Sequence, residues 1–421
     1  MAQRRSWIRR LGRAFLVAGL VLSGAVVLAH RWLIDRVGGA FAGDPAAIEG
    51  ALSEPARALL RAAWEGIDRE RLVDLHVHAV GLGTGGSGAW VNPEMRSWAH
   101  PIQHVQFLVY LSAAGIRDLE RADEQYVERL LALIRHQPAP GRYVLLAFDK
   151  VFRADGTEDL ERTRLYVPNE YVFALAARYP EVLIPAMSVH PFRPGALAEL
   201  ERWAARGGRI VKWLPNAMGI DPADPRLDPF YDTMHELDLT LLTHAGEEKA
   251  VESEQGQALG NPLLLRRPLE RGVRVVVAHC ASLGRYPDLD SPRRELRPAF
   301  ELFLRLMDEE RWRGRLFGEI SAVTQYNRAP QVLATLLERT DLHPRLLNGS
   351  DYPLPAINFL VRTRQLQRLG FITAEEREQL NEIYRYNPLL FDFVLKRTVR
   401  HPRTGRRFAP EVFLAKPELG L

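Results

Sequence analysis

Val73-Asp74-Leu75-His76-Val77-His78 is the stretch of this chain that says most about its fold and chemistry. The apolar residues Val73, Leu75 and Val77 suit a buried strand, and the glycines from Gly81 onward end it. Because side chains alternate along a strand, His76 and His78 point the same way, about 6–7 Å apart at ~3.3 Å per residue. Two imidazoles on one face can chelate a divalent metal, so this strand end predicts a metal site. The alternative is a strand end with two incidental histidines.

Seven further apolar runs follow, and a polar residue closes each of them. They span Arg142 to Asp149, Val182 to His190, Arg209 to Pro215, Asp238 to Gly246, Val273 to Ala281, Arg315 to Val323 and Leu346 to Pro353. Helical patterns fill the intervals, for example over Val172 to Tyr179, Gly195 to Arg206, Pro298 to Glu310 and Pro330 to Thr340. This alternation predicts an α/β fold with a parallel sheet, and eight such units in ~325 residues fit a (β/α)8 TIM barrel. A doubly wound open sheet is the alternative.

Polar side chains stand at the carboxyl ends of these predicted strands, which is where such barrels carry their active sites. The set is His76, His78, His190, Lys212, His244, His279 and Asp351. A metal held by His76, His78, His244 and Asp351 would keep a position open for water and lower the pKa of that water to about 7. The expected cofactor is therefore a divalent metal, with zinc as the favoured ion and either one or two ions per chain.

Two residues of this set are the candidate catalytic groups. Asp351 can both bind the metal and take a proton from water, and the alternative role is to cap the helix that follows strand eight. His279 is either a ligand of a second metal, a group that polarises the substrate oxygen, or the base of a one-metal site; otherwise it is a buried imidazole satisfied by backbone. His190, which precedes a proline, is expected to orient a ligand rather than to bind metal.

These motifs, in this order, resemble the amidohydrolase superfamily, and most closely its amidohydrolase-related branch, which also holds aminocarboxymuconate semialdehyde decarboxylase. The resemblance runs from about Leu72 to Phe391 and rests on Asp74-Leu75-His76-Val77-His78, Val189-His190-Pro191, Val211-Lys212, Thr243-His244-Ala245-Gly246, Ala278-His279-Cys280, Gly349-Ser350-Asp351-Tyr352-Pro353 and Asn387-Pro388-Leu389-Leu390-Phe391. In the binuclear branch of the superfamily, a lysine on the fourth strand is carbamylated and bridges two metals. In the amidohydrolase-related branch this lysine often bridges nothing. The resemblance therefore leaves open whether Lys212 is a metal ligand.

Loops after the strands are expected to recognise the substrate. The loop from Ala79 to Pro101 is long and glycine-rich, and we interpret it as a flexible lid that carries Trp90. Other candidate binding residues are Lys150 and Arg153 after strand two, and Tyr326 and Arg328 after strand seven. Arginine pairs bidentately with carboxylates, so a carboxylated small molecule is the expected substrate. Solvated surface charge is the alternative for each basic residue.

The net charge of +4 is set by the two ends of the chain. Five arginines lie within residues 1–13 and six basic residues within 396–407, so the rest of the chain carries −7. An acidic body argues against a nucleic-acid surface. The basic segment 396–421 is expected to be a solvated C-terminal extension. Cys280 is the sole cysteine, which excludes an internal disulfide, and we expect it to be a buried, inert thiol.

The N-terminus has the composition of a targeting or anchoring element. Five arginines precede an apolar run from Ala14 to Ala29, so we interpret residues 1–34 as a signal anchor or a cleaved signal peptide. The basic flank predicts that the catalytic domain lies on the exoplasmic side, which is the periplasm in a bacterium, either anchored to the membrane or secreted. Residues 35–70 are expected to form a linker and a helix, and residues 71–395 the barrel.

Three functions fit these predictions. The first is a metal-dependent hydrolase that cleaves a C–N, ester or lactone bond. The second is a lyase, a decarboxylase or hydratase acting on an unsaturated or aromatic acid, because relatives use the same ligands for both. The third is a non-catalytic binding barrel. The sequence leaves the oligomeric state open.

Overall fold

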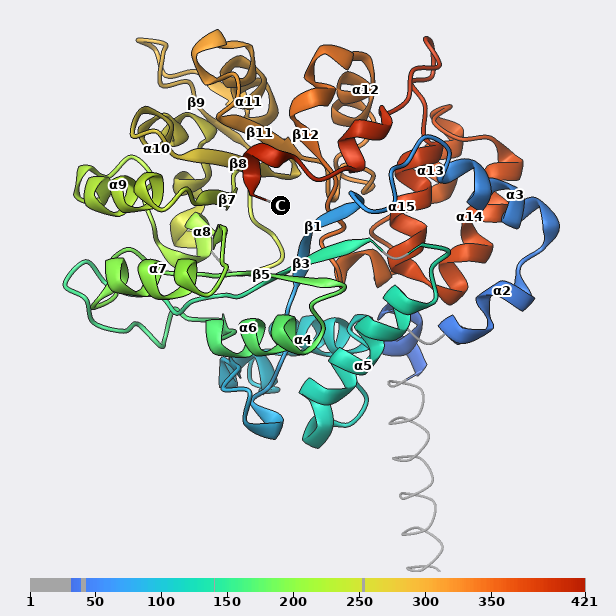
Figure 1. The fold of residues 1–421 in the computed structure, drawn as a ribbon, viewed down its shortest axis with the longest axis horizontal. Coiled ribbons are helices and arrows are strands. Elements are labelled where there is room, and N and C mark those ends of the chain that lie inside the picture. Colours follow the sequence, from blue (N-terminus) through green and yellow to red (C-terminus); the bar gives the residue numbers. More distant parts are fainter. Residues whose placement is uncertain (1–31, 39–42, 140, 252–253, 421) are drawn as a thin grey trace, which may run out of the picture.

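Eight parallel strands form the centre of the computed structural model, which describes residues 32–38, 43–139, 141–251 and 254–420 (Figure 1). The strands are β1 (Val73–His78), β3 (Arg142–Leu146), β5 (Leu183–Ala186), β6 (Ile210–Trp213), β7 (Thr240–His244), β8 (Arg274–Ala278), β11 (Leu316–Glu319) and β12 (Leu346–Leu347). They pair as β1-β3-β5 and as β12-β11-β8-β7-β6. Single parallel bridges, between Met187 and Val211 and between Val77 and Tyr352, join the two sheets at both edges. The parallel α/β prediction is confirmed, and all eight predicted runs contain one of these strands.

Helices surround the strands and connect them, as Figure 1 shows. They are α2 (Ile48–Ala51), α3 (Glu54–Ala63), α4 (Pro101–Ala113), α5 (Ala122–Arg135), α6 (Asn169–Arg178), α7 (Ala196–Ala205), α8 (Pro215–Met218), α9 (Asp228–Glu236), α10 (Arg266–Glu270), α11 (Ala299–Asp308), α12 (Gln331–Glu338), α13 (Thr363–Arg368), α14 (Ala374–Tyr386) and α15 (Pro388–Thr398). Helix α15 starts at Asn387-Pro388, where the Asn387 side chain accepts a hydrogen bond from the Leu390 N–H at 2.9 Å. An Asn cap followed by proline is a strong start signal, because proline needs no hydrogen-bond partner in the first turn.

Apolar side chains fill the interior of the barrel. Val73 and Leu75 of β1 pack with residues from the other strands, among them Leu146, Leu242 and Phe317. Leu419, near the C-terminus, belongs to the same cluster and is fully buried. The end of the chain therefore closes the floor of the barrel, opposite the carboxyl ends of the strands.

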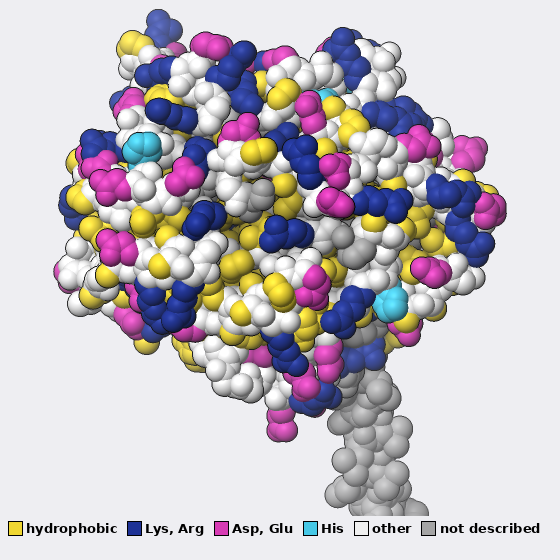
Figure 2. Space-filling model, viewed as in Figure 1, with side chains coloured by type: hydrophobic (Ala, Val, Ile, Leu, Met, Phe, Trp, Pro, Cys, Tyr) yellow, Lys and Arg dark blue, Asp and Glu magenta, His cyan; other side chains and the backbone are white. Residues whose placement is uncertain are grey.

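The expectation of a solvated C-terminal extension is wrong. Phe408 and Phe413 are buried, and the Asn348 N–H donates to the Val412 carbonyl at 2.8 Å. Two of the basic side chains serve this packing, because Arg400 pairs with Glu376 at 2.7 Å and Arg397 donates to the Ala63 carbonyl at 2.9 Å. On the face drawn in Figure 2, basic and acidic side chains are interspersed.

The predicted signal anchor lies almost entirely outside the described residues. Within the described ranges, no helix combines the length and the apolar character needed to cross a bilayer. Residues 32–38 are helical, and Ile34 and Val37 pack on Val109 and Ala113 of α4. Helices α2 and α3 lie in the segment predicted as a linker and a helix.

Candidate metal centre

The two histidines of β1 meet Asp351 at the carboxyl end of the barrel. Nε2 of His76 lies 3.2 Å from Nε2 of His78 and 3.5 Å from Oδ1 of Asp351, and Nε2 of His78 lies 3.1 Å from the same oxygen. His76 is buried, whereas His78 is 29% exposed and faces the opening. Burial lowers the pKa of His76 well below its usual value, and the nearby Lys212 and histidines lower it further. His76 is therefore neutral at pH 7, with a lone pair available on Nε2.

Glu319 at the end of β11 fixes this arrangement. Its Oε2 lies 3.0 Å from Nδ1 of His76 and accepts the Ser321 hydroxyl at 2.6 Å. Burial raises the pKa of Glu319 to about 7. When Glu319 is ionised, the contact places the proton of His76 on Nδ1, which leaves Nε2 free for a ligand.

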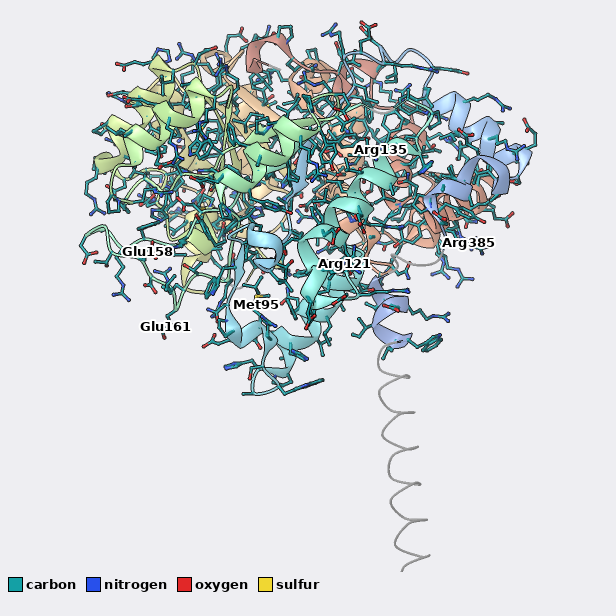
Figure 3. The ribbon with its side chains drawn as sticks, turned by 60° about the horizontal axis from the view of Figure 1, so that its bottom comes forward. Met95, Arg121, Arg135, Glu158, Glu161 and Arg385 are labelled. Atoms are coloured by element: carbon teal, nitrogen blue, oxygen red, sulfur yellow. The ribbon has the colours of Figure 1, made fainter. Side chains whose placement is uncertain are left out.

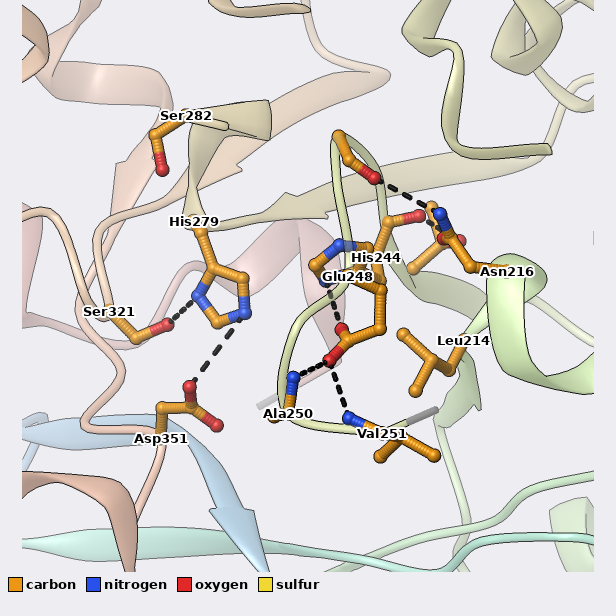
Figure 4. Close-up of polar contacts among 12 residues, drawn as sticks. Leu214, Asn216, His244, Glu248, Ala250, Val251, His279, Ser282, Ser321 and Asp351 are labelled. Atoms are coloured by element: carbon orange, nitrogen blue, oxygen red, sulfur yellow. Dashed lines mark hydrogen bonds and ion pairs between the residues drawn. The ribbon is translucent and has the colours of Figure 1, made fainter. Parts of the chain in front are cut away.

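His279 faces Asp351 across from His244 and Glu248 (Figure 4). Nδ1 of His279 lies 2.6 Å from Oγ of Ser321, and its Nε2 lies 3.8 Å from Oδ2 of Asp351. Donor atoms of His76, His279 and Asp351 all lie within 4.8 Å of one another. His279 and Asp351 both have positive φ, 56° and 61°, a region that side chains other than glycine rarely adopt. Such backbone is frequent where a functional site holds it in place.

The loop that carries Asp351 lies against the strand of the two histidines. The Asp351 N–H donates to the His76 carbonyl at 2.8 Å, and the Ser350 N–H donates to the Asp74 carboxylate at 2.9 Å. A Cβ on Gly349 would lie 2.8 Å from Cβ of His76 and would also collide with the Glu319 carboxylate. Glycine at this position therefore allows the loop to approach the site closely.

His244 at the end of β7 completes the set of histidines. Its ring centroid lies 5.4 Å from that of His279, and its Nδ1 lies 3.4 Å from Oε2 of Glu248. The Val251 N–H donates to Glu248 at 2.9 Å (Figure 4). Nε2 of His244 is buried, and among the described residues it has no hydrogen-bond partner. A buried imidazole nitrogen without a hydrogen-bond partner destabilises the fold unless it binds a ligand, so this atom fits a metal-binding role.

Lys212 on β6 is buried and points into the centre. Its Nζ lies 3.2 Å from Nε2 of His76. Burial lowers the pKa of Lys212 to about 8, an effect that the carboxylates of Asp351, Glu319 and Glu248 oppose. All six residues predicted as metal ligands lie at this end of the strands, and those whose donor atoms are within 4.8 Å of one another are His76, His279 and Asp351.

The predicted substrate-binding residues divide into two groups. Arg328 is close to the centre, where its Nη1 donates to Oγ of Ser282 at 2.5 Å. The pKa of His279 is lowered mainly by burial and, to a smaller extent, by the positive charge of Arg328. Tyr326 is half-buried, and Cζ of Arg362 lies over its ring, 4.1 Å from the ring centroid. Lys150 and Arg153 are engaged elsewhere, in ion pairs with Glu158 at 2.9 Å and Asp159 at 3.0 Å.

The glycine-rich loop that carries Trp90 is tied down along its length. The Gly83 N–H donates to Asp123 of α5 at 3.2 Å, and Leu82 and Ser87 donate to the same carboxylate. Trp90–Val91 forms strand β2, which pairs with β4 (Leu165–Tyr166). These contacts do not favour the flexible lid that we expected, because a buried carboxylate with three donors holds the loop in place.

His190 is held by backbone rather than by a metal ligand. Its Nε2 lies 3.0 Å from the Met218 carbonyl, and Nδ1 accepts the Phe192 N–H at 3.2 Å. Burial lowers the pKa of His190 to about 4. The interpretation of His190 as a residue that orients a ligand is wrong, because both ring nitrogens are occupied by main-chain groups.

Three side chains that contact the histidines of the centre were not predicted from the sequence, namely Glu319, Ser321 and Glu248. Glu319 had a detectable signal, since it closes the apolar run Leu316-Phe317-Gly318 at the strand end where the other polar residues cluster. Ser321 and Glu248 lie in loops and have no such signal.

A sequence model of the family described as amidohydrolase matches residues 73–389, which is more than half of the chain. The chain belongs to the amidohydrolase family. The resemblance drawn from the motifs is confirmed, and the family match indicates a metal-dependent enzyme. No curated protein matches the chain.

Solved structures similar to this amidohydrolase are distant in sequence. An uncharacterised TIM-barrel protein of Bordetella bronchiseptica has 18% identity and a TM-score of 0.45, covering 73% of this chain and 94% of its own. A 5-carboxyvanillate decarboxylase of Sphingomonas paucimobilis has 14% identity and a TM-score of 0.45, with coverage of 73% and 95%. A 4-oxalomesaconate hydratase of Rhodopseudomonas palustris has 14% identity and a TM-score of 0.38, with coverage of 76% and 96%.

Proposed function

We propose that this chain is a hydrolase that uses one divalent metal, held by His76, His78, His244 and Asp351. The observation that carries the proposal is the unpartnered Nε2 of His244, buried beside a convergence of imidazole and carboxylate donors. Imidazole nitrogens with one carboxylate suit zinc, and the same set also accepts manganese or iron. When bound, such an ion supplies Lewis-acid activation of water and of a carbonyl oxygen.

The side chains around the ion handle protons and position the substrate. Asp351 accepts the proton that the attacking water loses, at Oδ2, the oxygen that faces His279. His279 donates through Nδ1 to Ser321, whose hydroxyl donates to Glu319, so Nε2 of His279 carries a lone pair facing Asp351 and can take the proton on from that carboxylate. Glu319 keeps the His76 tautomer that leaves Nε2 unprotonated.

Lys212 in this proposal is an amine rather than a bridge between two metals. Its Nζ faces the same His76 nitrogen that binds the ion, and three carboxylates surround it. A buried lysine in this position balances those negative charges and can hold a substrate oxygen.

Arg328 gives the proposal its substrate class, a small molecule with a carboxylate. Its Nε is buried and has no hydrogen-bond partner in the described part of the chain, whereas its Nη1 donates a hydrogen bond to Ser282. A guanidinium with a free donor beside an ion and its ligands suits a planar carboxylate. We therefore propose hydrolysis of a C–N, ester or lactone bond in a carboxylated substrate.

The test is a screen of carboxylated lactones, esters, amides and unsaturated acids. The full chain is first freed of metal with a chelator and then reloaded with zinc or manganese. Metal-dependent release of an acid together with an amine or alcohol supports hydrolysis, whereas release of carbon dioxide assigns the chain to the lyases instead. His78→Ala is expected to lose the activity, and His136→Ala, which changes an exposed histidine, is the matched control. Absence of any turnover by the reloaded chain contradicts a catalytic role.

A further inference from the structure

Helix α4 is an unusual surface helix because none of its residues, Pro101 to Ala113, is charged. Ile102 is 81% exposed and Val105 is 41% exposed. Trp98, just before the helix, is 64% exposed. Exposed helix faces of soluble proteins ordinarily carry charged and polar residues, so this composition points to a partner surface.

The exposed residues continue an apolar stripe that is already half covered. Ile102, Val105, Val109 and Ala113 follow one another at helical spacing and so share one side of α4. Val109 and Ala113 are buried in a cluster to which Ile34 and Val37 of the 32–38 helix contribute. Among the described residues the covered part ends there, and Ile102 and Val105 stay exposed.

The chain order identifies the occupant of the uncovered part. Residues 32–38 are the first described segment, and the apolar run from Ala14 to Ala29 ends two residues before them in the sequence. Figure 3 shows the 32–38 helix and the segment of Met95, which leads to Trp98, along the same lower edge of the molecule. A membrane held by that apolar run would therefore lie against this edge.

Basic groups beside the 32–38 helix have the charge that lipid phosphates require. A cleft of about 510 Å³ contains Arg362, Arg364 and Arg368 among its lining residues, and none of the three forms an ion pair with another described residue. Asn358, also in the lining, donates its N–H to the Val37 carbonyl at 2.9 Å. Arginines near an anionic leaflet add attraction to the burial of apolar side chains.

Helix α4 also contacts the catalytic side of the barrel. Gln106 and Tyr110 donate to the Ala250 carbonyl at 2.8 and 2.9 Å. Ala250 in turn donates to Glu248, the partner of His244. A surface that engages α4 therefore lies next to the loop at the mouth of the site.

We propose that the outer side of α4, with Trp98, Ile102 and Val105, docks on an anionic lipid bilayer and places the mouth of the site at the membrane surface. Aromatic and aliphatic side chains insert into the headgroup region, where tryptophan is favoured. The proposal does not depend on the metal or on the reaction.

The test uses the full chain with Ile102→Cys, because Cys280 is buried and leaves the new thiol as the reactive one. A nitroxide on this thiol is measured with vesicles of phosphatidylethanolamine and phosphatidylglycerol, and its collisions with oxygen and with a water-soluble nickel complex are compared. Leu296→Cys is the control, since Leu296 is 57% exposed and lies on strand β10 (Leu296–Pro298). This strand pairs with β9 (Arg285–Pro287), which lies far from α4 in Figure 1.

Docking predicts a several-fold rise in the ratio of oxygen to nickel collisions at position 102 when vesicles are added, with no change at position 296. An unchanged ratio at position 102 would overturn the proposal. So would protection from both reagents, which would mean that residues 14–29 or a second copy cover the stripe. Failure of the chain to sediment with the vesicles would also overturn it.

Discussion

Replacement of Glu319 by Gln is the sharpest perturbation of the site, because it removes the ionisable carboxyl group and almost no volume. The carboxylate accepts hydrogen bonds from Nδ1 of His76 at 3.0 Å and from the hydroxyl of Ser321 at 2.6 Å. Both of these contacts are made by Oε2, and Oε1 accepts the Ser321 backbone N–H. The amide of Gln must turn its NH2 group either toward that N–H or toward the His76 and Ser321 side chains, so at least one donor loses its acceptor and the His76 proton is no longer confined to Nδ1.

The size of the effect follows from how such partners act on metal ligands. Loss of a hydrogen-bond partner of a ligating histidine typically weakens metal binding about 10–100-fold, which is about 1.4–2.7 kcal/mol. Because Glu319 also supports His279 through Ser321, we expect Glu319→Gln to lie near the upper end of that range.

Competition for zinc against a chromogenic chelator measures this effect directly. Asp149→Asn is the matched control, since Asp149 is a buried acid that binds Arg193 at 3.1 Å and the His190 N–H at 2.8 Å, with no contact to the metal centre. Equal zinc affinity in wild type and Glu319→Gln would refute the reasoning, and so would an equal loss in the Asp149→Asn control.

Three further predictions concern other parts of the molecule. Lys212→Ala is expected to keep the wild-type ratio of metal to chain in elemental analysis, whereas a fall from two ions to one would show that Lys212 bridges a binuclear site. Leu419→Ala is expected to lower the free energy of unfolding by about 2–3 kcal/mol in urea titrations, because it opens a cavity in the barrel floor; no change would mean that the C-terminus is not seated there. His190 has a pKa of about 4 in the folded chain against an ordinary 6.5, so the unfolded chain binds protons first as the pH falls. The free energy of unfolding should therefore drop by up to about 3 kcal/mol from pH 6.5 to 4, and His190→Gln should flatten that slope; parallel slopes would contradict the assignment.

The barrel and the ligand set were predictable because their determinants are local. A buried strand leaves a clear apolar run, and its last polar residues project at one end, so His76, His78, His244 and Lys212 were placed by strand position alone. Parallel connectivity then brings the carboxyl ends to one face. His279 and Asp351 lie just beyond their strands, where their positive φ angles turn the side chains inward.

What the sequence did not reveal depends on contacts between distant segments. Glu319 has its role only because it meets His76, 243 positions away. The C-terminal segment looks solvated from its charge, yet its intervening apolar residues, such as Phe413 and Leu419, seal the barrel. Arg153 and Arg328 look alike in sequence, but Arg153 is exposed and pairs with Asp159 away from the site, whereas Arg328 lies beside the metal centre.

Anomalous diffraction from crystals of the zinc-loaded chain, recorded at the zinc edge, identifies the side chains that bind the ion. We predict one peak per chain, about 2.0–2.2 Å from Nε2 of His76, His78 and His244 and from a carboxylate oxygen of Asp351. A zinc peak bound by other residues, or the absence of a peak at these four side chains, would contradict it.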